Sequence, residues 1–399
     1  MTGLRPRAAI AGIYEYPYRN NSSYGPLAIK AMSAVRALED AGLTLADVDA
    51  LYDAGEAAAH PGLEVAEYLG LDPDVLGTTD VGGSSFELFA ADACRAIAAG
   101  EARVALVTYA ETPRSGRVAI PPMAGTGRGQ PSSADNIEAP FGLNIVANYA
   151  LVAARHAYQY GTTPEQLAEI AVTTRAHAQR NPMAIAGLKD IGLKHTGEIS
   201  VADVLNSRMI ADPLHMLDCC LVTDGGGAVV IVAEDLAASL PKPPAWILGT
   251  GMAVSYQGPD RDITVSAAAK SGPRAFQRAG VTPADIDVAM LYDSFTITVL
   301  MLLEDLGFCA KGEGGSYVEG GRLRFDQPGG PALNTDGGGL SSNHPGMRGL
   351  FLLIEAARQL RGESTAQVAN ARLAVAHGNG VLLGTRHVGG TVILGRERP

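Results

Sequence analysis

Cysteine is scarce in this chain, and its few positions exclude several kinds of site. The 399 residues contain four cysteines: Cys94, Cys219, Cys220 and Cys309. None stands with histidine at the spacing of a zinc or other metal site. The adjacent pair Cys219-Cys220 would form only a strained disulfide. We therefore expect no bound metal and no cofactor held by the chain itself.

Basic clusters and long apolar runs are also missing. Lys and Arg number 31 against 42 Asp and Glu, giving a net charge of −11 without a basic run. This balance argues against nucleic acid as a partner. No apolar stretch reaches the roughly 18 residues of a membrane helix, and the first residues run into a strand without a signal-peptide pattern. The sequence predicts no membrane association and a cytoplasmic location.

The chain contains an internal repeat. Residues 28–53 (AIKAMSAVRALEDAGLTLADVDALYD) match residues 267–293 (AAAKSGPRAFQRAGVTPADIDVAMLYD), and the strand beginning at Gly225 has a shorter counterpart at Gly389. A repeat of this length indicates duplication of a whole α/β unit and not an array of short repeats. We predict an N-terminal half from residues 1–111 and 211–240, and a C-terminal half from residues 241–399.

Residues 112–210 interrupt the first half and have a different composition. They begin with a Pro-, Gly- and Ser-rich stretch and continue with helical patterns, one of which opens with Thr163, Pro164 and Glu165. Thr at an N-cap and Pro at the first helical position are typical helix starts. We predict that this insertion forms a cap over the first half's active edge, as long functional loops often do.

Polar residues framed by glycine follow three predicted strands of the second half. The segments are LYDSFT at 291–296, NTDGGGLSSNHPGMRG at 334–349 and AHGNG at 376–380. Ligands of α/β proteins collect at such strand ends, and glycines let backbone N–H groups approach them. The catalytic candidates are Tyr292, Asp293, His344 and His377. Tyr292 has an alternative role as a core tyrosine, which its repeat partner Tyr52 supports, and Asp293 has one as a helix cap.

Further candidates are small or polar residues near these segments, or at the start of a helix predicted from about Leu88 to Ala99. We expect the following to contact substrate: Ser84, Ser342, Asn343, Gly346, Asn379 and Gly380.

At these residues the chain resembles the thiolase superfamily. NTDGGGLSSNHPGMRGL resembles the loop whose His-Pro-x-Gly segment supplies an oxyanion-hole histidine, and EDLGFCAKGEGGSYVEGGRL resembles the sterol-carrier-protein-x or lipid-transfer-protein branch. The resemblance implies a thiolase fold with two five-stranded αβαβα halves. Thiolases carry a nucleophilic cysteine at the start of the helix that here follows Asp80–Phe86, where the helix dipole favours thiolate. This chain has glycine and serine there.

Within that branch the chain resembles cysteine-less acyl-CoA aldolases, which cleave steroid-derived β-hydroxyacyl-CoA with a small zinc-ribbon and OB-fold partner. The resemblance implies a homodimer that binds two copies of that partner. It also implies catalytic tyrosines; Tyr292 matches one, whereas Ser342 and Asn343 stand where the second is expected.

A retro-aldol cleavage needs a base for the β-hydroxyl proton and donors for the thioester enolate. We assign the donor role to His344 with N–H groups near Gly346 and Gly380, and the proton transfer to Tyr292, oriented by Asp293. His377 would relay a proton to the enolate carbon. A phenol with a pKa near 10 needs a nearby positive charge or hydrogen bonding to lower that pKa before it can act as a base, and the sequence shows no obvious cation.

Two other functions remain open. A Claisen-type acyltransferase would need a thiol near His344 and His377. A non-catalytic subunit would bind acyl-CoA or lipid, or support a partner.

Overall fold

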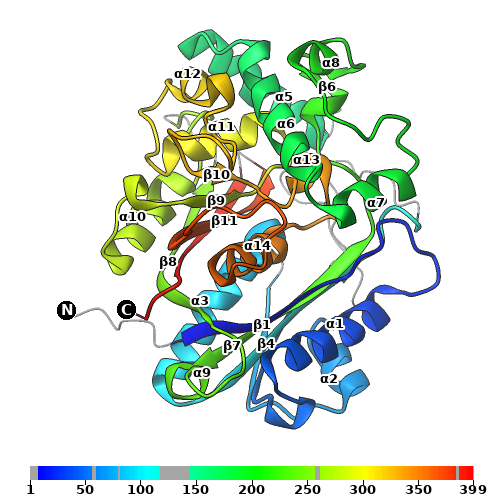
Figure 1. Cartoon of the computed structure of the whole chain (residues 1–399), viewed down its shortest axis with the longest axis vertical. Coiled ribbons are helices and arrows are strands. Elements are labelled where there is room, and N and C mark those ends of the chain that lie inside the picture. Colours follow the sequence, from blue (N-terminus) through cyan, green and yellow to red (C-terminus); the bar gives the residue numbers. More distant parts are fainter. Residues whose placement is uncertain are drawn as a thin grey trace.

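The computed structural model describes residues 8–55, 60–79, 81–116, 144–256, 261–382 and 386–398, and ten strands form one sheet (Figure 1). The strands of the first half are β1 (Ala8–Glu15), β2 (Ala50–Ala54), β3 (Val75–Thr78), β4 (Val104–Glu111) and β7 (Gly225–Ala233). Those of the second half are β8 (Ala245–Tyr256), β9 (Val288–Leu291), β10 (Ala332–Leu333), β11 (Leu373–Leu382) and β12 (Arg386–Gly395). A separate two-stranded sheet pairs β5 (Met209–Ala211) with β6 (Leu214–His215).

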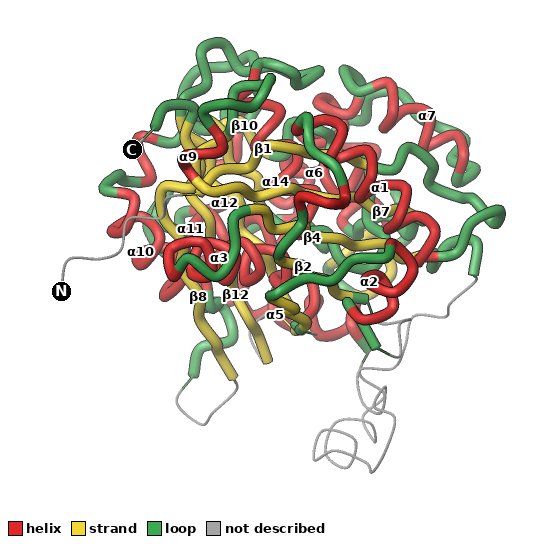
Figure 2. Tube along the Cα trace, turned by 90° about the horizontal axis from the view of Figure 1, so that it is seen from below, coloured by secondary structure: helices red, strands yellow, loops and turns green. Residues whose placement is uncertain are grey.

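The strand order shows that the two halves share one topology. From the middle of the sheet outward, the first half runs β1-β7-β4-β2-β3 and the second runs β8-β12-β11-β9-β10. Each strand thus has a counterpart at the same place in the other half, which confirms the duplicated α/β fold. The halves are hydrogen-bonded to each other where Ala9 pairs with Trp246 and Ile10 with Ala245. Figure 2 shows the paired ends of β8 and β12 extending past the rest of the sheet.

Helices of the two halves repeat in the same way. The first half contributes α1 (Pro26–Ala41), α2 (Leu63–Leu69), α3 (Ser85–Ala99) and α9 (Glu234–Ala237). The second contributes α10 (Ala268–Ala279), α11 (Thr296–Asp305), α12 (Gly314–Val318), α13 (Gly338–Ser341) and α14 (Gly349–Arg361). Helix α1 with β2 and helix α10 with β9 are the two copies of the sequence repeat. The structure therefore places both copies equivalently.

Identical turns explain why the repeated sequence folds twice in the same way. Thr44 and Asp47 form a capping box after α1, and Thr282 and Asp285 form another after α10. In the second half, Asp287 then accepts hydrogen bonds from the backbone N–H groups of the residues entering β11. Its counterpart Asp49 does the same at the entrance of β4. Each Asp thereby fixes the register between two neighbouring parallel strands.

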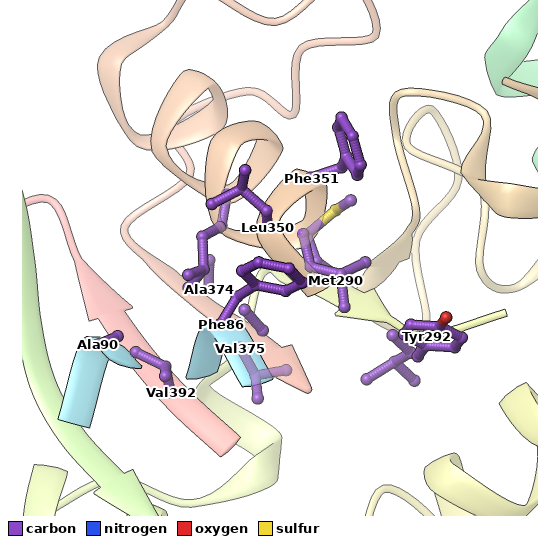
Figure 3. Close-up of a cluster of buried hydrophobic side chains, with 14 of the residues drawn as sticks. Phe86, Ala90, Met290, Tyr292, Leu350, Phe351, Ala374, Val375 and Val392 are labelled. Carbon is purple, nitrogen blue, oxygen red and sulfur yellow. The ribbon is translucent and has the colours of Figure 1, made fainter. Parts of the chain in front are cut away.

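The central core lies between the sheet and the paired helices α3 and α14. Phe86 of α3, Leu350 of α14 and Met290 of β9 are all fully buried and meet in one cluster (Figure 3). These side chains bring the start of α3 close to the end of β9. Burial of large apolar side chains, at about 1.5–3 kcal/mol each, stabilises this arrangement.

The insertion forms helices α5 (Ile145–Tyr160), α6 (Pro164–Ala178), α7 (Pro182–Asp190) and α8 (Val201–Leu205). Thr163 caps α6 as expected, in a capping box with Gln166. Helix α6 packs on α11, α12 and α13, and α5 packs on α11 and β11, all from the second half (Figure 1). Helices α5 and α6 thus cover the second half, where a cap over the first had been expected, whereas the end of α7 contacts the first half through Asp190, which accepts the backbone N–H of Arg19. Most of the predicted Pro-, Gly- and Ser-rich excursion lies outside the described residues.

No helix in the described ranges combines the length and the apolar composition that crossing a membrane requires.

Candidate functional site

The start of helix α3 carries no side chain that could serve as a nucleophile at Gly83. A Cβ added at Gly83 would lie 2.0 Å from Cε2 and 2.7 Å from the hydroxyl oxygen of Tyr292. The phenol ring therefore fills the space that a side chain at position 83 would take. Ser84, the next residue, is fully buried, and its hydroxyl donates to the Val81 carbonyl at 3.0 Å. Position 83 tolerates only glycine unless Tyr292 moves.

Tyr292 follows β9 and is held at both ends. Its backbone N–H donates to the His377 carbonyl at 3.0 Å, and its hydroxyl donates to the Gly346 carbonyl at 3.3 Å. The ring meets the His344 imidazole edge to face, with centroids 5.5 Å apart. Burial raises the pKa of Tyr292 well above its ordinary value, and a negative charge on Cys220 would raise it further. In the free protein Tyr292 therefore stays protonated.

His344 lies in the loop between α13 and α14, beside Tyr292. Its backbone N–H donates to the Thr223 hydroxyl at 3.0 Å. Burial, together with the nearby Arg348 charge, lowers the pKa of His344 to about 4. Its Nε2 atom is buried without a hydrogen-bond partner in the described part of the chain. Because a buried polar atom without a partner is unfavourable, this nitrogen is suited to a ligand atom that reaches it.

Arg348 supplies the cation that sequence reasoning missed. It is fully buried, with Nε 3.1 Å from Asp293 and an NH2 group 2.7 and 2.6 Å from the two carboxylate oxygens of Asp336. The Arg348 charge acts to lower the pKa of Tyr292, but the effect of burial is larger. The residue stands inside the quoted loop motif, so its position was visible, whereas its ion pairs were not.

Asp293 connects this charge network to the loop. Its carboxylate accepts the backbone N–H groups of Gly339 at 2.8 Å and Leu340 at 3.2 Å, at the start of α13. Burial raises the pKa of Asp293 to about 6, against the opposing effect of Arg348. Its described contacts fix the helical turn before His344, and none of them reaches the Tyr292 hydroxyl.

Ser342 and Asn343 belong to the same loop. The Asn343 amide oxygen accepts the Thr223 hydroxyl at 3.0 Å, and its Nδ2 donates to Glu15 at 3.3 Å. The Ser342 carbonyl accepts Nε of the buried Arg19 at 3.2 Å. These contacts tie the loop to the end of β1 in the first half. The Asn343 side chain is therefore directed to protein groups that position the loop.

His377 does not point toward Tyr292. A Cβ added at the next residue, Gly378, would lie 1.9 Å from the Glu87 carboxyl of α3, so position 378 faces α3. Neighbouring side chains on a strand point to opposite faces, which directs His377 to the other side. There its Nδ1 lies 2.8 Å from Thr391 Oγ1, which lies 2.9 Å from Ser271 Oγ of α10. Burial, followed by the neighbouring His387, lowers the pKa of His377 to about 3.

The segment after His377 returns to the α3 start. A Cβ added at Gly380 would lie 1.8 Å from the Val81 carbonyl oxygen and 2.4 Å from the Ser84 hydroxyl. Only glycine permits this approach. The intervening residue, Asn379, donates through Nδ2 to the hydroxyl of Tyr149 at 2.9 Å. Tyr149 lies on cap helix α5 and was also missed, because its helical pattern was indistinguishable from a packing face.

Together, the structure gathers Tyr292, His344, Gly346 and Gly380 around the start of α3. Asp293 contributes to this group indirectly, through its ion pair with Arg348. The His377 imidazole lies on the opposite face of the sheet, although its carbonyl holds Tyr292.

Comparison with known proteins agrees with this geometry. Residues 249–396 match the family model described as thiolase C-terminal domain-like. A steroid side-chain-cleaving aldolase of Thermomonospora curvata is 34% identical over 384 residues, covering 92% of this chain and 93% of that protein. An acetyl-CoA acetyltransferase of Methanothermobacter thermautotrophicus is 33% identical over 363 residues, covering 88% and 90%.

A solved structure described as an Ltp2–ChsH2(DUF35) aldolase superposes with a TM-score of 0.87 at 32% identity, covering 99% of each chain. The match therefore extends through both halves and the inserted helices. With this similarity along almost its whole length, the chain belongs to the thiolase superfamily, in a branch that includes both acetyltransferases and side-chain-cleaving aldolases.

Proposed function

We propose that this protein is an acyl-CoA carbon–carbon lyase that cleaves a β-hydroxyacyl-CoA by a retro-aldol reaction. The single observation that carries the proposal is the Tyr292 ring in the space where a side chain at Gly83 would stand. A phenol there replaces a nucleophile with an acid–base group. The aldolase relatives, which include a steroid side-chain-cleaving enzyme, support this reaction and a sterol side-chain thioester as substrate.

The reaction assigns a role to each neighbouring group. His344, neutral and with a free Nε2, would donate a hydrogen bond to the thioester oxygen as the enolate forms, together with N–H groups near Gly346 and Gly380. A preorganised donor of this kind contributes about 3–4 kcal/mol to the transition state. Tyr292 would exchange the proton of the β-hydroxyl. Arg348 and Asp293 would hold the loop that carries His344.

The retro-aldol reaction can be tested by its products. A panel of β-hydroxyacyl-CoA esters, including steroid side-chain thioesters, should yield a ketone or aldehyde plus a shortened acyl-CoA by mass spectrometry. No acyl-enzyme should form. A protein that binds these esters without cleaving any of them would instead be a binding subunit.

A Claisen-type acyltransferase is the second candidate, favoured by the archaeal acetyltransferase relative. It requires a thiolate, and Cys220 lies beside the segment that follows Tyr292, because its backbone N–H donates to the Ser294 carbonyl at 2.9 Å. Burial raises the pKa of Cys220 well above its ordinary value, which disfavours the thiolate. If the protein is a lyase, the Cys220→Ala variant should cleave β-hydroxyacyl-CoA at the wild-type rate. Loss of turnover together with loss of a trapped acyl-enzyme would establish the acyltransferase.

We also propose a homodimer formed through the β3 edge of the sheet. Strand β3 has a free edge in the described sheet, and Leu76 on β3 is 48% exposed. Leu63 and Tyr68 on the adjoining α2 are 56% and 59% exposed. An open strand edge beside apolar side chains favours pairing with another chain. Light scattering should give a dimer mass, and Leu76→Asp should shift it toward the monomer.

A small zinc-ribbon and OB-fold protein is the proposed partner, giving two copies of each chain. The support is the solved structure described as Ltp2–ChsH2(DUF35), which contains a second protein. Co-expression with a small protein of this class should yield a complex of twice the mass of one pair. We further propose that coenzyme A enters only with the substrate, that the chain holds no cofactor of its own, and that it acts in the cytoplasm.

A further inference from the structure

The loop that carries His344 is held at two successive carbonyls by two buried arginines. Arg348 of α14 donates through Nη1 to the Asn343 carbonyl at 2.8 Å. Arg19, which follows β1 in the first half, donates through Nε to the Ser342 carbonyl at 3.2 Å. Arg348 belongs to the same stretch of chain as the loop, whereas Arg19 lies 323 residues away from Ser342 in sequence. The position of His344 therefore depends on a residue of the other half.

Arg19 is itself fixed along its whole length, and it is fully buried. Its Nη1 donates to the Tyr16 carbonyl at 2.6 Å, and its Nη2 donates to Glu15 at 2.5 Å. Helix α7 packs on its stem, because a Cβ added at Gly187 would lie 2.5 Å from Arg19 Cγ. The end of the same helix holds its backbone, since Asp190 accepts the Arg19 N–H at 3.0 Å. The guanidinium therefore presents Nε to the loop in one direction.

Glu15, the ion-pair partner of Arg19, binds the loop as well. Its carboxylate accepts Asn343 Nδ2 at 3.3 Å and Arg358 of α14 at 2.8 Å. Burial acts to raise the pKa of Glu15, but the charges of Arg19 and Arg358 lower it to about 2. Glu15 is therefore ionised at neutral pH, and hydrogen bonds to ionised groups are stronger than those between neutral groups. Together, Glu15 and Arg19 hold both residues that precede His344.

We propose that Arg19 is a positioning residue that holds the His344 imidazole beside Tyr292. The inference rests on the proposed role of His344 in the retro-aldol reaction. The two rings meet with centroids 5.5 Å apart, and Nε2 of His344 has no hydrogen-bond partner in the described part of the chain. Since the described residues leave this nitrogen unbonded, the backbone that Arg19 holds sets where it lies. A donor stabilises an oxyanion best when it is already in place as the charge develops.

Arg19→Lys tests this role. The substitution keeps a positive charge beside Glu15 and so leaves no buried carboxylate unpaired. The lysine ammonium is a single point and does not reproduce the planar fork that reaches Ser342, Tyr16 and Glu15 from three nitrogens. We expect turnover of β-hydroxyacyl-CoA to fall by about ten- to a hundredfold, because a displacement of about 1 Å is enough for such a loss. KM should stay within a few-fold of the wild-type value.

Arg361→Lys is the matched control. The Arg361 side chain is 1% exposed, and it also joins an acid and a backbone carbonyl of the first half, Asp40 at 2.9 Å and Ile10 at 3.3 Å. Neither contact involves the loop that carries His344. Whatever Arg361→Lys costs in melting temperature, its turnover per folded protein should stay near the wild-type value.

A second measurement observes His344 without any substrate. In protein containing ¹⁵N-labelled histidine, the ring resonances of His344 are those that disappear in His344→Gln. We expect Arg19→Lys to shift them and Arg361→Lys to leave them in place. Unchanged resonances in Arg19→Lys, or an equal shift in Arg361→Lys, would overturn the proposal.

The two measurements separate this inference from the proposed function. If the wild type cleaves β-hydroxyacyl-CoA, normal turnover in Arg19→Lys or an equal loss in Arg361→Lys overturns the positioning role, while the retro-aldol function stands. If the wild type cleaves none of these esters, the retro-aldol function is refuted. The His344 resonances then decide alone: a shift in Arg19→Lys upholds the positioning of His344, and unchanged resonances refute it.

Discussion

The contact between Gly83 and Tyr292 makes a quantitative prediction. A Cβ at position 83 would lie 2.0 Å from Cε2 and 2.5 Å from Cζ of a ring that is 4% exposed, so Gly83→Ala must displace the phenol. Overpacking of this kind costs about 1–3 kcal/mol of unfolding free energy, measurable by denaturant titration. Displacement of a proton-transferring group by about 1 Å can lower turnover by about a hundredfold. We expect both losses in the β-hydroxyacyl-CoA cleavage assay.

The chain contains its own control for this substitution. A Cβ added at Gly77 of β3 would lie 2.4 Å from Cδ1 and 2.5 Å from Cε1 of Tyr52, the repeat counterpart of Tyr292. Gly77→Ala should therefore cost similar stability while leaving turnover per folded protein near normal. The reasoning fails if Gly83→Ala cleaves substrate at the wild-type rate, or if Gly77→Ala loses as much turnover as Gly83→Ala.

Three further predictions concern the same group of residues. Tyr292→Phe should lower turnover by at least about a hundredfold with little change in melting temperature, whereas Tyr52→Phe should not affect turnover; equal activities would remove Tyr292 from the mechanism. His344→Ala should remove nearly all turnover and leave acyl-CoA affinity within a few-fold, because the oxyanion forms only as the bond breaks; an equal loss of binding would indicate a ground-state role. His344 keeps a folded pKa of about 4, below the ordinary 6.5, so its contribution to stability is full above pH 6.5 and is lost as pH falls toward 4. His344→Gln should flatten the pH dependence of the unfolding free energy over that range, and an unchanged slope would contradict the burial of the imidazole.

The duplicated fold was predictable because both copies of the repeat carry the same short-range interactions. The capping boxes at Thr44 and Thr282 and the strand-anchoring carboxylates Asp49 and Asp287 recur at matching places. Each is a short-range signal that the sequence shows directly. The pairing of β1 with β8, which joins the halves into one sheet, has no such signal, because it depends on how two finished units meet.

The candidate site was only partly predictable, and strand β11 shows why. The sequence does not reveal which of its side chains point to which face of the sheet. His377 and Gly378 follow the apolar run LAVA, in a strand that is covered on both faces. Such a strand lacks the polar–apolar alternation that would reveal which face each residue takes. Sequence reasoning therefore identified His377 as polar and glycine-framed but not the direction of its imidazole, which is toward Thr391 and away from Tyr292.

The groups that were missed act through long-range contacts. Arg348 is paired with Asp293 and Asp336, and Tyr149 meets Asn379 across more than two hundred residues of chain. A buried arginine with two carboxylates is fixed in place, because removing either partner would leave a charge uncompensated in the interior. The Arg348 charge lowers the pKa of Tyr292 by less than burial raises it, so the phenol stays protonated. This favours transfer of protons between neutral groups over a stable phenolate, which is the chemistry that a retro-aldol cleavage without a cysteine requires.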